Sequence, residues 1–199
     1  LIWALESLKG PDERIRIPGF YDDVIPPTER DLAFFDAMPS PEEALRELHG
    51  VRQFVAGRAW KDLNRAVFEP TCNVEGIASG YLGEGGKTIG PARAFAKLDI
   101  RLVPDQDPGD ILAKLRAHLD AQGFADVQLI ATTRGAIWPS RTDPDDPLVA
   151  LNAETGEEVY GKPSVTMPMV GGSSPVYAFA RPLGIPVISP GVGYPGSRT

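Results

Sequence analysis

Residues 73–123, NVEGIASGYLGEGGKTIGPARAFAKLDIRLVPDQDPGDILAKLRAHLDAQG, decide the fold of this chain. Within them, residues 92–103 alternate between apolar and polar side chains. The apolar side chains that share one side of an extended backbone are Ala94, Ala96, Leu98, Ile100 and Leu102. Arg101 falls on the opposite, polar side, where Phe95 is the one exception. Pro104 ends the pattern because proline cannot donate to a β-ladder. A period of two therefore predicts a strand with one buried face and one polar face.

A helix is predicted directly after this strand. Asp107 supplies the N-cap and Pro108 occupies the first helical position. Gly123 ends the helix. Its apolar side chains at helical spacing are Ile111, Leu115 and Leu119. Their stripe can cover the apolar face of the strand, so strand and helix form one packing unit and Arg101 stays on the uncovered face.

The rest of the first 141 residues extends this unit into an α+β fold. Gly83–Gly86 supplies hairpin turn residues, and Gly90–Pro91 indicates a bulge or a kink in the return strand. The expected strands are residues 14–17, 74–82, 87–103 and 125–133. The expected helices are residues 1–8, 28–38, 40–48, 58–68 and 108–122. We expect a ferredoxin-like two-layer domain, an antiparallel sheet with helices on one face.

The pattern changes at residues 138–144, and we place a domain boundary between residues 141 and 142. The remaining elements are expected to be a helix at 147–159, a strand at 164–169, a turn at 171–175, a helix at 176–181, a strand at 185–188 and a loop at 191–196. Alternating strands and helices are typical of an α/β domain. Residues 142–199 are too few to close such a sheet, so we expect an incomplete α/β portion.

Charge and composition limit the class of partner. The formal net charge of the 199 residues is −7, which argues against nucleic acid and anionic membranes as partners. One cysteine, Cys72, cannot form an internal disulfide, which fits a cytoplasmic protein. The chain contains no apolar stretch long enough to span a bilayer. It opens inside a helical pattern without an initiator Met, so we expect a fragment of a longer protein.

Three kinds of catalytic site lack the necessary residues. Ser173 and Ser174 lie where a strand turns into a helix, but the G-x-S-x-G pattern is absent and the chain has two histidines, His49 and His118. The spacings H-x-D, H-x-x-x-H and C-x-x-C are absent, so we expect no metal ligands within this chain. Residues 83–88 superficially resemble a phosphate-binding loop, but the first glycine that its pattern requires is absent, so no such loop is predicted. We therefore expect this chain to contribute no catalytic residue.

The remaining candidates could bind an anion. Arg101 lies on the polar strand face, and Thr88 lies thirteen residues before it. Gly172 and Ser173 offer backbone N–H groups and a hydroxyl before a helix, where anions bind. Arginine favours bidentate contact with a carboxylate. The alternative is that Arg101 pairs with Asp99 on an exposed sheet face, and the pattern leaves both open.

The same residues resemble the dimerisation (lid) domain of peptidase family M20, the dinuclear metallopeptidases that include carnosine dipeptidases, aminoacylases and glutamate carboxypeptidases. The resemblance rests on GIASGYLGEGGKTIGPARAFAKLDIRLVPDQDP at 76–108. Further matching segments are SLKG, RIRIPGFYDDV, RTDPDDP, EEVYGKPSV, GGSSP and GVGYPGS. K-T-x-x-P-A, R-L-V-P-x-Q-D-P and G-G-S occur together in this order, closest to the dipeptidase-like branch.

The resemblance implies that residues 1–141 are the lid, which forms a homodimer. It implies that residues 142–199 are the C-terminal portion of the catalytic domain. It implies that Thr88, Arg101, Gly172 and Ser173 bind the carboxylate end of a dipeptide or N-acyl amino acid. It also implies two divalent metal ions, usually zinc, bound by parts of the parent enzyme outside this chain. Two positions depart from the family: Gly90 replaces an apolar residue, and the segment GAIWPSR at 135–141 lacks a histidine.

Three functions are compatible with these residues. The first is a part of a metal-dependent amidohydrolase or dipeptidase that supplies dimerisation and substrate-carboxylate binding. The second is a stand-alone dimerisation module without catalytic activity. The third is a ferredoxin-like domain that binds a small regulatory ligand without using GGSSP. The motif set favours the first, and by itself the chain is expected to be inactive.

Overall fold

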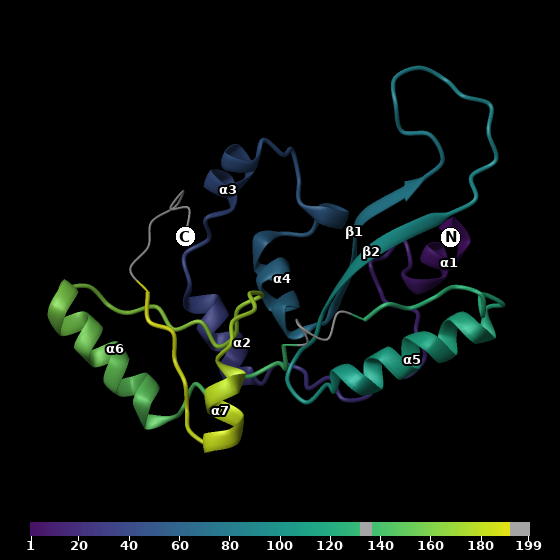
Figure 1. Cartoon of the computed structure of the whole chain (residues 1–199). Coiled ribbons are helices and arrows are strands. Elements are labelled where there is room, and N and C mark those ends of the chain that lie inside the picture. The colour runs from purple at the N-terminus through teal and green to yellow at the C-terminus, as the bar shows by residue number, and fades with distance from the viewer. Residues whose placement is uncertain (132–136, 192–199) are drawn as a thin grey trace. The chain divides into compact units, whose positions relative to one another are not determined.

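The computed structural model describes residues 1–131 and 137–191. Its chain divides into two compact units, and their elements are labelled in Figure 1. Unit 1 consists of Leu1–Val24 and Pro70–Trp138, and unit 2 consists of Ile25–Glu69 and Pro139–Thr199. Each unit is therefore built from two separate stretches of the sequence. The expected division into a lid over residues 1–141 and a catalytic portion over residues 142–199 stays a prediction.

Unit 1 contains an antiparallel hairpin of β1 (Thr71–Ser79) and β2 (Ala94–Arg101). Arg101 pairs with Thr71 at one end, and a loop of residues 80–93 joins the strands at the other end. β1 begins and ends three residues earlier than expected, and β2 is shorter than the expected strand at 87–103. The expected bulge or kink at Gly90–Pro91 was wrong because these residues lie in the loop. The register shift lies instead between Val74 and Gly76.

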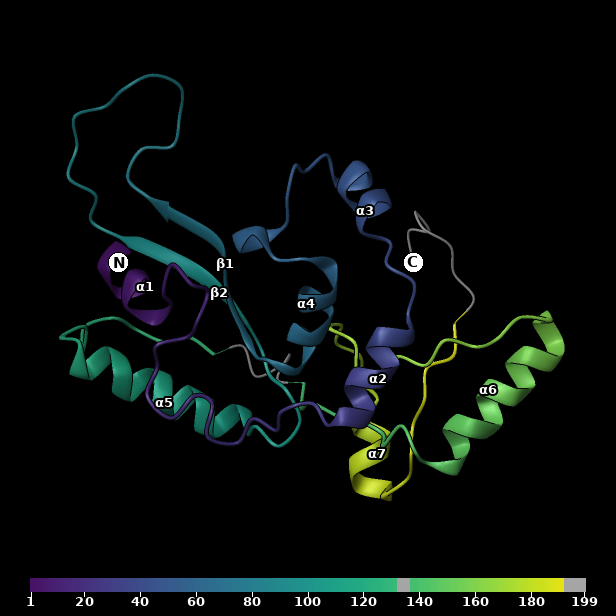
Figure 2. The same cartoon turned by 180° about the vertical axis from the view of Figure 1, so that it is seen from behind.

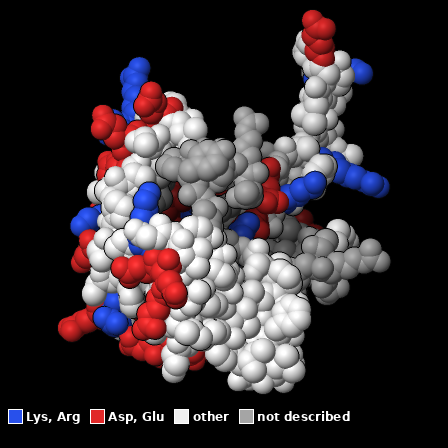
Figure 3. Space-filling view, turned by 90° about the vertical axis from the view of Figure 1, so that its left-hand side faces the viewer, with Lys and Arg blue, Asp and Glu red and all other residues white. Residues whose placement is uncertain are grey.

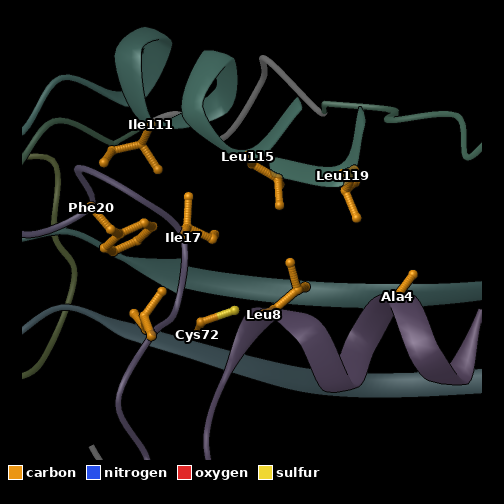
Figure 4. Close-up of a cluster of buried hydrophobic side chains, with 9 residues drawn as sticks. Ala4, Leu8, Ile17, Phe20, Cys72, Ile111, Leu115 and Leu119 are labelled. Atoms are coloured by element: carbon orange, nitrogen blue, oxygen red, sulfur yellow. The ribbon is translucent and has the colours of Figure 1, made fainter. Parts of the chain in front are cut away.

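The core of unit 1 lies between the hairpin and two helices, α1 (Ile2–Leu8) and α5 (Pro108–Ala121). Figures 1 and 2 both show α5 running alongside the hairpin. In Figure 4 the apolar stripe of α5 points toward the strands and α1. The buried core residues are Ala4, Leu8, Ile15, Ile17, Phe20, Cys72, Ile111, Leu115 and Leu119. The α+β class predicted from the sequence is confirmed.

Local signals at the ends of α5 explain why this helix was predicted accurately. The Asp107 side chain accepts a hydrogen bond from the Gly109 N–H at 2.6 Å, and Pro108 opens the helix. Gly123, just beyond the C-cap, has a φ of +83°, a left-handed conformation that favours glycine. Helix α5 is also tied to α1, because Nε2 of buried His118 lies 3.1 Å from Oγ of Ser7. Since the Ser7 hydroxyl donates to the Ala4 carbonyl, Nε2 of His118 is the donor in this pair.

Two predicted strands of unit 1 were wrong. The strand at residues 14–17 shrinks to an isolated bridge between Lys9 and Ile15. Residues 125–131 form no strand, and residues 132–133 of that prediction lie outside the described part. Val127 still packs against the core, as the alternation indicated. Its carbonyl, however, accepts from Nη1 of Arg116 at 2.5 Å, so a side chain takes the place of a neighbouring strand.

Unit 2 consists of short helices and irregular segments. Its helices in the first stretch are α2 (Glu29–Ala37), α3 (Glu42–His49) and α4 (Trp60–Arg65), with 3-10 turns η1 (Val55–Gly57) and η2 (Ala66–Phe68). Its second stretch contains α6 (Pro147–Tyr160) and α7 (Tyr177–Leu183). Phe35 of α2 packs edge-on against Phe68 at a centroid distance of 6.0 Å. The predicted helices of this unit are confirmed to within a few residues.

The strands predicted for the second stretch of unit 2 were wrong. Residues 164–169 and 185–188 are irregular, and the loop predicted at 191–196 lies outside the described residues beyond Gly191. The backbone of Val187 is hydrogen-bonded by a side chain instead of by a neighbouring strand. Oγ1 of Thr142 donates to the Val187 carbonyl at 2.6 Å and accepts from the Val187 N–H at 2.9 Å. Helices α6 and α7 bury none of their side chains within the chain.

Charged side chains lie mainly on the surface. On the face shown in Figure 3, Lys and Arg side chains are scattered among acidic and uncharged ones. Among the exposed ion pairs, Arg30 contacts Asp145 at 3.1 Å. Such exposed pairs stabilise a fold by about 0–1 kcal/mol each. None of the described helices combines the length and the apolar character needed to cross a membrane.

Candidate functional site

Arg101 is the last residue of β2 and lies on the polar face of the hairpin, as predicted. Its Nε donates to Oδ2 of Asp99 at 2.9 Å, and its side chain is 44% exposed. The alternative that Arg101 pairs with Asp99 is therefore realised. Because the Arg101 side chain is only partly covered, its pair with Asp99 is compatible with contact between the guanidinium and a carboxylate.

Thr88 lies in the exposed loop of residues 80–93. The loop has internal contacts: the Tyr81 hydroxyl donates to the carbonyl of Glu84 at 3.1 Å, and Nζ of Lys87 lies 5.2 Å from the centroid of the Tyr81 ring. Thr88 follows Lys87 directly in this loop.

Thr88 and Arg101 are not brought together within one chain. The loop with Thr88 extends from the end of the hairpin where Ser79 pairs with Ala94, and Arg101 lies at the opposite end of β2. The seven steps of strand between Ala94 and Arg101 span about 23 Å at about 3.3 Å each. One small ligand cannot contact both side chains of the same chain in this arrangement.

Gly172 and Ser173 lie in unit 2, in an exposed irregular segment. Helix α7 begins at Tyr177 with Val176 as its N-cap, so Gly172 and Ser173 do not cap it. The helix has seven residues, and its N-terminus gives no anion site at these positions. Any contact with a carboxylate here depends on the Ser173 hydroxyl and the local backbone rather than on a helix end.

The acidic and histidine side chains of the described residues are spread over the structure rather than gathered at one metal centre. Within residues 1–131 and 137–191, no group of three or more His, Cys, Asp or Glu side chains is arranged to hold a metal ion. Structural and catalytic zinc sites use three or four such ligands. The described residues therefore do not fit a metal centre.

Sequence reasoning missed a structural residue within R-L-V-P-x-Q-D-P. Gln106 is 1% exposed, and its side chain makes hydrogen bonds in both directions. Oε1 accepts from the Val103 N–H at 3.0 Å, and Nε2 donates to the Phe20 carbonyl at 2.8 Å. The signal was present as an amide inside a motif, but its partner Phe20 lies 86 residues away.

A buried ion pair in unit 2 was also missed. Asp31 is fully buried, and its Oδ1 accepts from Nη2 of Arg141. Its Oδ2 accepts from the N–H of Thr28 at 2.9 Å and from the Thr28 hydroxyl at 2.8 Å. The spacing Thr-x-x-Asp could have revealed the capping box at the start of α2. The sequence carried no signal for Arg141 as the partner.

Burial also perturbs Cys72, which lies on β1 opposite Ile100. Removal from water raises the pKa of its thiol above the ordinary value of 9.0; the positive charge of Lys9 opposes the rise and the negative charge of Asp99 adds to it. A thiol with a raised pKa is a poor nucleophile at neutral pH, so Cys72 acts as an apolar core residue.

Comparison with known proteins gives a consistent family. The profile of the family described as "Peptidase dimerisation domain" matches residues 17–127, more than half of the chain. The Cys-Gly metallodipeptidase DUG1 of Saccharomyces cerevisiae is 28% identical over 183 residues, 88% of this chain and 37% of that protein. The human Beta-Ala-His dipeptidase is 29% identical over 120 residues, 60% of this chain and 24% of that protein.

A solved structure supports the same assignment. The M20 family metallo-carboxypeptidase Sso-CP2 from Sulfolobus solfataricus superposes with a TM-score of 0.84 at 35% identity, covering 91% of this chain and 41% of that chain. The chain thus spans only 24% to 37% of the length of the two curated relatives. Because the profile match covers most of unit 1 and the intervening stretch of unit 2, the chain belongs to the M20 peptidase dimerisation-domain family.

Proposed function

We propose that this chain is the dimerisation and substrate-binding part of a metal-dependent dipeptidase or amidohydrolase. The full-length protein hydrolyses the amide bond of a dipeptide or an N-acyl amino acid. Within it, this chain forms the dimer and binds the carboxylate end of the substrate. The observation that carries the proposal is the family profile match over residues 17–127, joined by a metallodipeptidase relative that aligns with 88% of the chain.

The roles of the candidate residues follow from their chemistry. The guanidinium of Arg101 binds the substrate carboxylate by charge-assisted hydrogen bonds. The hydroxyl groups of Thr88 and Ser173 each donate one further hydrogen bond, and Gly172 leaves the backbone open to close approach. Because Thr88 and Arg101 lie at opposite ends of the hairpin, they serve one substrate only if two copies of the chain contribute to the site.

The metal centre is assigned to parts of the full-length protein outside these residues. The described side chains do not fit a metal site, whereas the S. cerevisiae relative is a metallodipeptidase. Two divalent ions, zinc in this proposal, would supply Lewis-acid activation of water and of the scissile carbonyl. This chain supplies orientation, which fixes the substrate relative to that centre.

Dimerisation through unit 1 has support in exposed apolar side chains. The hairpin leaves Val74, Ile77 and Phe95 between 51% and 59% exposed. By the strand register, Val74 and Ile77 lie on the face of Leu98 and Ala96, and Phe95 lies on the opposite face. An exposed aromatic side chain such as Phe95 is typical of a protein–protein contact. The matching profile is also that of a dimerisation domain. We assign the homodimer contact to this hairpin.

Hydrolysis is tested on the full-length protein with dipeptides and N-acyl amino acids as substrates. We expect cleavage to stop after dialysis against a chelator and to return when Zn²⁺ is added. Chelator-resistant cleavage would overturn the metal-dependent mechanism. A protein that dimerises but cleaves neither substrate class with Zn²⁺ supplied would support the stand-alone dimerisation module instead.

The dimer contact is tested by sedimentation of the full-length protein. We expect Phe95→Asp to shift the protein from dimer to monomer, because a carboxylate replaces an apolar side chain at the contact. Val55→Asp is the matched control, since Val55 is 50% exposed and lies on η1, outside the hairpin. A dimer that persists unchanged in Phe95→Asp would place the contact elsewhere.

A further inference from the structure

The segment that carries Ser173 is held by a hydrogen bond from the guanidinium of Arg141, a residue outside that segment. Nε of Arg141 donates to the carbonyl of Pro168 at 3.1 Å, five residues before Ser173. Pro168 is buried, although most of the segment around it is exposed. The anchor therefore fixes one buried point in an otherwise exposed and irregular stretch of unit 2.

The same guanidinium is held in place by two further contacts. Nη2 of Arg141 donates to Oδ1 of Asp31. The guanidinium carbon Cζ of Arg141 lies 5.0 Å from the centroid of the Phe68 ring. A planar guanidinium that is bound through its edge and stacked on a ring has little freedom to rotate. Arg141 thus links α2, η2 and the segment with Pro168, all within unit 2.

Asp31 is also oriented by contacts other than the one with Arg141. Its second carboxylate oxygen accepts two hydrogen bonds from Thr28, so Oδ1 is presented in one direction. A fully buried carboxylate needs a cation and hydrogen bonds to offset its lost hydration. The buried Asp31–Arg141 pair is therefore costly in lost hydration, which points to a role in fixing the position of the segments that it joins.

The chain after Pro168 follows η2 closely. A Cβ placed on Gly171 would lie 3.8 Å from Cγ1 of Val67, an ordinary packing distance. The segment is thus held at Pro168 by Arg141 and passes close to η2 at Gly171. Gly172 and Ser173 follow directly, so their location depends on the anchor that precedes them.

We infer that Arg141, oriented by Asp31, is a positioning residue that holds the Gly172–Ser173 segment in place to bind the substrate carboxylate. The inference rests on the proposed function for the role of Ser173. Arg141 itself contacts no substrate in this assignment. It acts through the Pro168 carbonyl, and Asp31 acts through Arg141.

The first test measures anchoring without any assay of activity. In the full-length protein, amide hydrogen exchange is compared at residues 169–173 for wild type, Arg141→Lys, Arg141→Gln and Asp31→Asn. Arg141→Lys keeps the positive charge beside Asp31 but cannot reproduce the guanidinium's simultaneous bonds to Asp31 and Pro168. We expect exchange at these amides to rise by about tenfold or more, as the loss of a charge-assisted bond allows.

Arg30 and Asp145 provide a matched control. Their ion pair joins the same two stretches of unit 2, but both side chains are about 60% exposed. We expect Arg30→Gln to leave exchange at residues 169–173 unchanged. Unchanged exchange in both Arg141 variants would overturn the inference. If Arg141→Gln fails to fold, Arg141→Lys decides, because it retains a cation for Asp31.

The second test measures whether the anchor matters for substrate. We expect Arg141→Lys to raise KM for a dipeptide by about tenfold with a smaller change in kcat, since it loosens binding of the carboxylate rather than the chemistry. In a Ser173→Ala background the same substitution should raise KM little further. A rise in KM that is equally large in both backgrounds would overturn positioning through Ser173.

The two proposals fail in different ways. If Ser173→Ala leaves KM unchanged, the proposed carboxylate contact at Ser173 is wrong, while the exchange data still decide whether Arg141 anchors the segment. If Ser173→Ala raises KM but Arg141→Lys changes neither KM nor exchange, Ser173 keeps its role and the positioning role of Arg141 is wrong.

Discussion

The buried side chain of Gln106, in the loop after β2, donates a hydrogen bond from Nε2 to the carbonyl of Phe20 at 2.8 Å. Gln106 is only 1% exposed. Its Oε1 also accepts from the Val103 N–H, so one amide satisfies two buried backbone groups. The loop must be held because Asp105, with a φ of +72°, adopts a left-handed backbone that is unfavourable for a residue with a side chain. Gln106 therefore sets how strand β2 leads into helix α5.

Gln106→Met is predicted to destabilise the fold strongly. The thioether matches the length of the amide but leaves the Phe20 carbonyl and the Val103 N–H buried without their partner. Each of the two unsatisfied groups costs about 1–3 kcal/mol, so we expect a loss of about 2–6 kcal/mol in the free energy of unfolding. Urea denaturation measures it, with exposed Gln122→Met as the control. A loss below that of the control would show that water replaces the amide.

The sequence predicted those elements whose signals are local. Asp107–Pro108 and Gly123 mark both ends of α5 within the helix's own neighbourhood, so its bounds were predicted to within one residue. The alternation before Pro104 likewise gave β2, because side-chain periodicity does not depend on the partner strand. Residues 125–131 alternate in the same way, yet they need a neighbouring strand, and Arg116 binds their backbone instead.

Cys72 is predicted to resist thiol reagents in the folded protein. Burial raises its pKa, so less thiolate is present than for an exposed cysteine at the same pH. We expect labelling at pH 8 to be slow in buffer and fast in concentrated urea, with Cys72→Ala as the blank. Labelling at equal rates in both solvents would place Cys72 at the surface.

The same shift predicts a pH effect on stability. Because the folded-state pKa is above the unfolded value of about 9, the contribution of the protonated thiol is complete below pH 9 and is lost as the pH rises through the folded-state pKa. Comparing wild type with Cys72→Ala between pH 7 and pH 10 isolates this contribution. A difference between the two proteins that stays constant across this range would contradict the raised pKa.

Thr142→Val is predicted to destabilise the backbone around Val187 and to make it more mobile. The isosteric substitution removes both hydrogen bonds of the hydroxyl, at 2.6 Å and 2.9 Å, while it keeps the shape. We expect a loss of about 1–2 kcal/mol and faster amide exchange at Val187. Thr142→Ser is the matched control because it retains the hydroxyl. If both variants exchange alike, the methyl group rather than the hydroxyl holds this segment.

The candidate site was less accessible to sequence reasoning than the fold. Asp31 and Arg141 are 110 residues apart, and nothing in their own surroundings identifies them as partners. Ser173 was expected at a helix end because a turn preceded an apolar run. The structure starts α7 at Tyr177, since Pro175 and Val176 form a turn first. Helix starts are fixed by capping details that composition leaves open by a few residues.

Thr88→Val is predicted to weaken substrate binding without affecting the fold. Thr88 is exposed in the loop of residues 80–93, so its hydroxyl contributes little to folding. Loss of one hydrogen bond to a charged carboxylate corresponds to about 1.5–3 kcal/mol, or a rise in KM of about 10- to 150-fold. Steady-state kinetics of the full-length protein measure it. Thr88→Ser should retain wild-type KM, and a rise in that variant equal to Thr88→Val would count against the hydroxyl as the contact.

Arg101→Ala is predicted to abolish the preference for substrates with a free carboxylate. A charged hydrogen bond to the carboxylate contributes about 1.5–3 kcal/mol, so kcat/KM for a dipeptide should fall by about 10- to 150-fold. Loss of the exposed pair with Asp99 should by itself change the free energy of unfolding by only about 0–1 kcal/mol. The matched substrate is the same dipeptide with a C-terminal amide, which wild type should cleave poorly and Arg101→Ala equally poorly. Lys97→Ala, on the same face of β2, is the control for a general loss of positive charge. If Arg101→Ala still discriminates between the acid and the amide as wild type does, another cation binds the carboxylate.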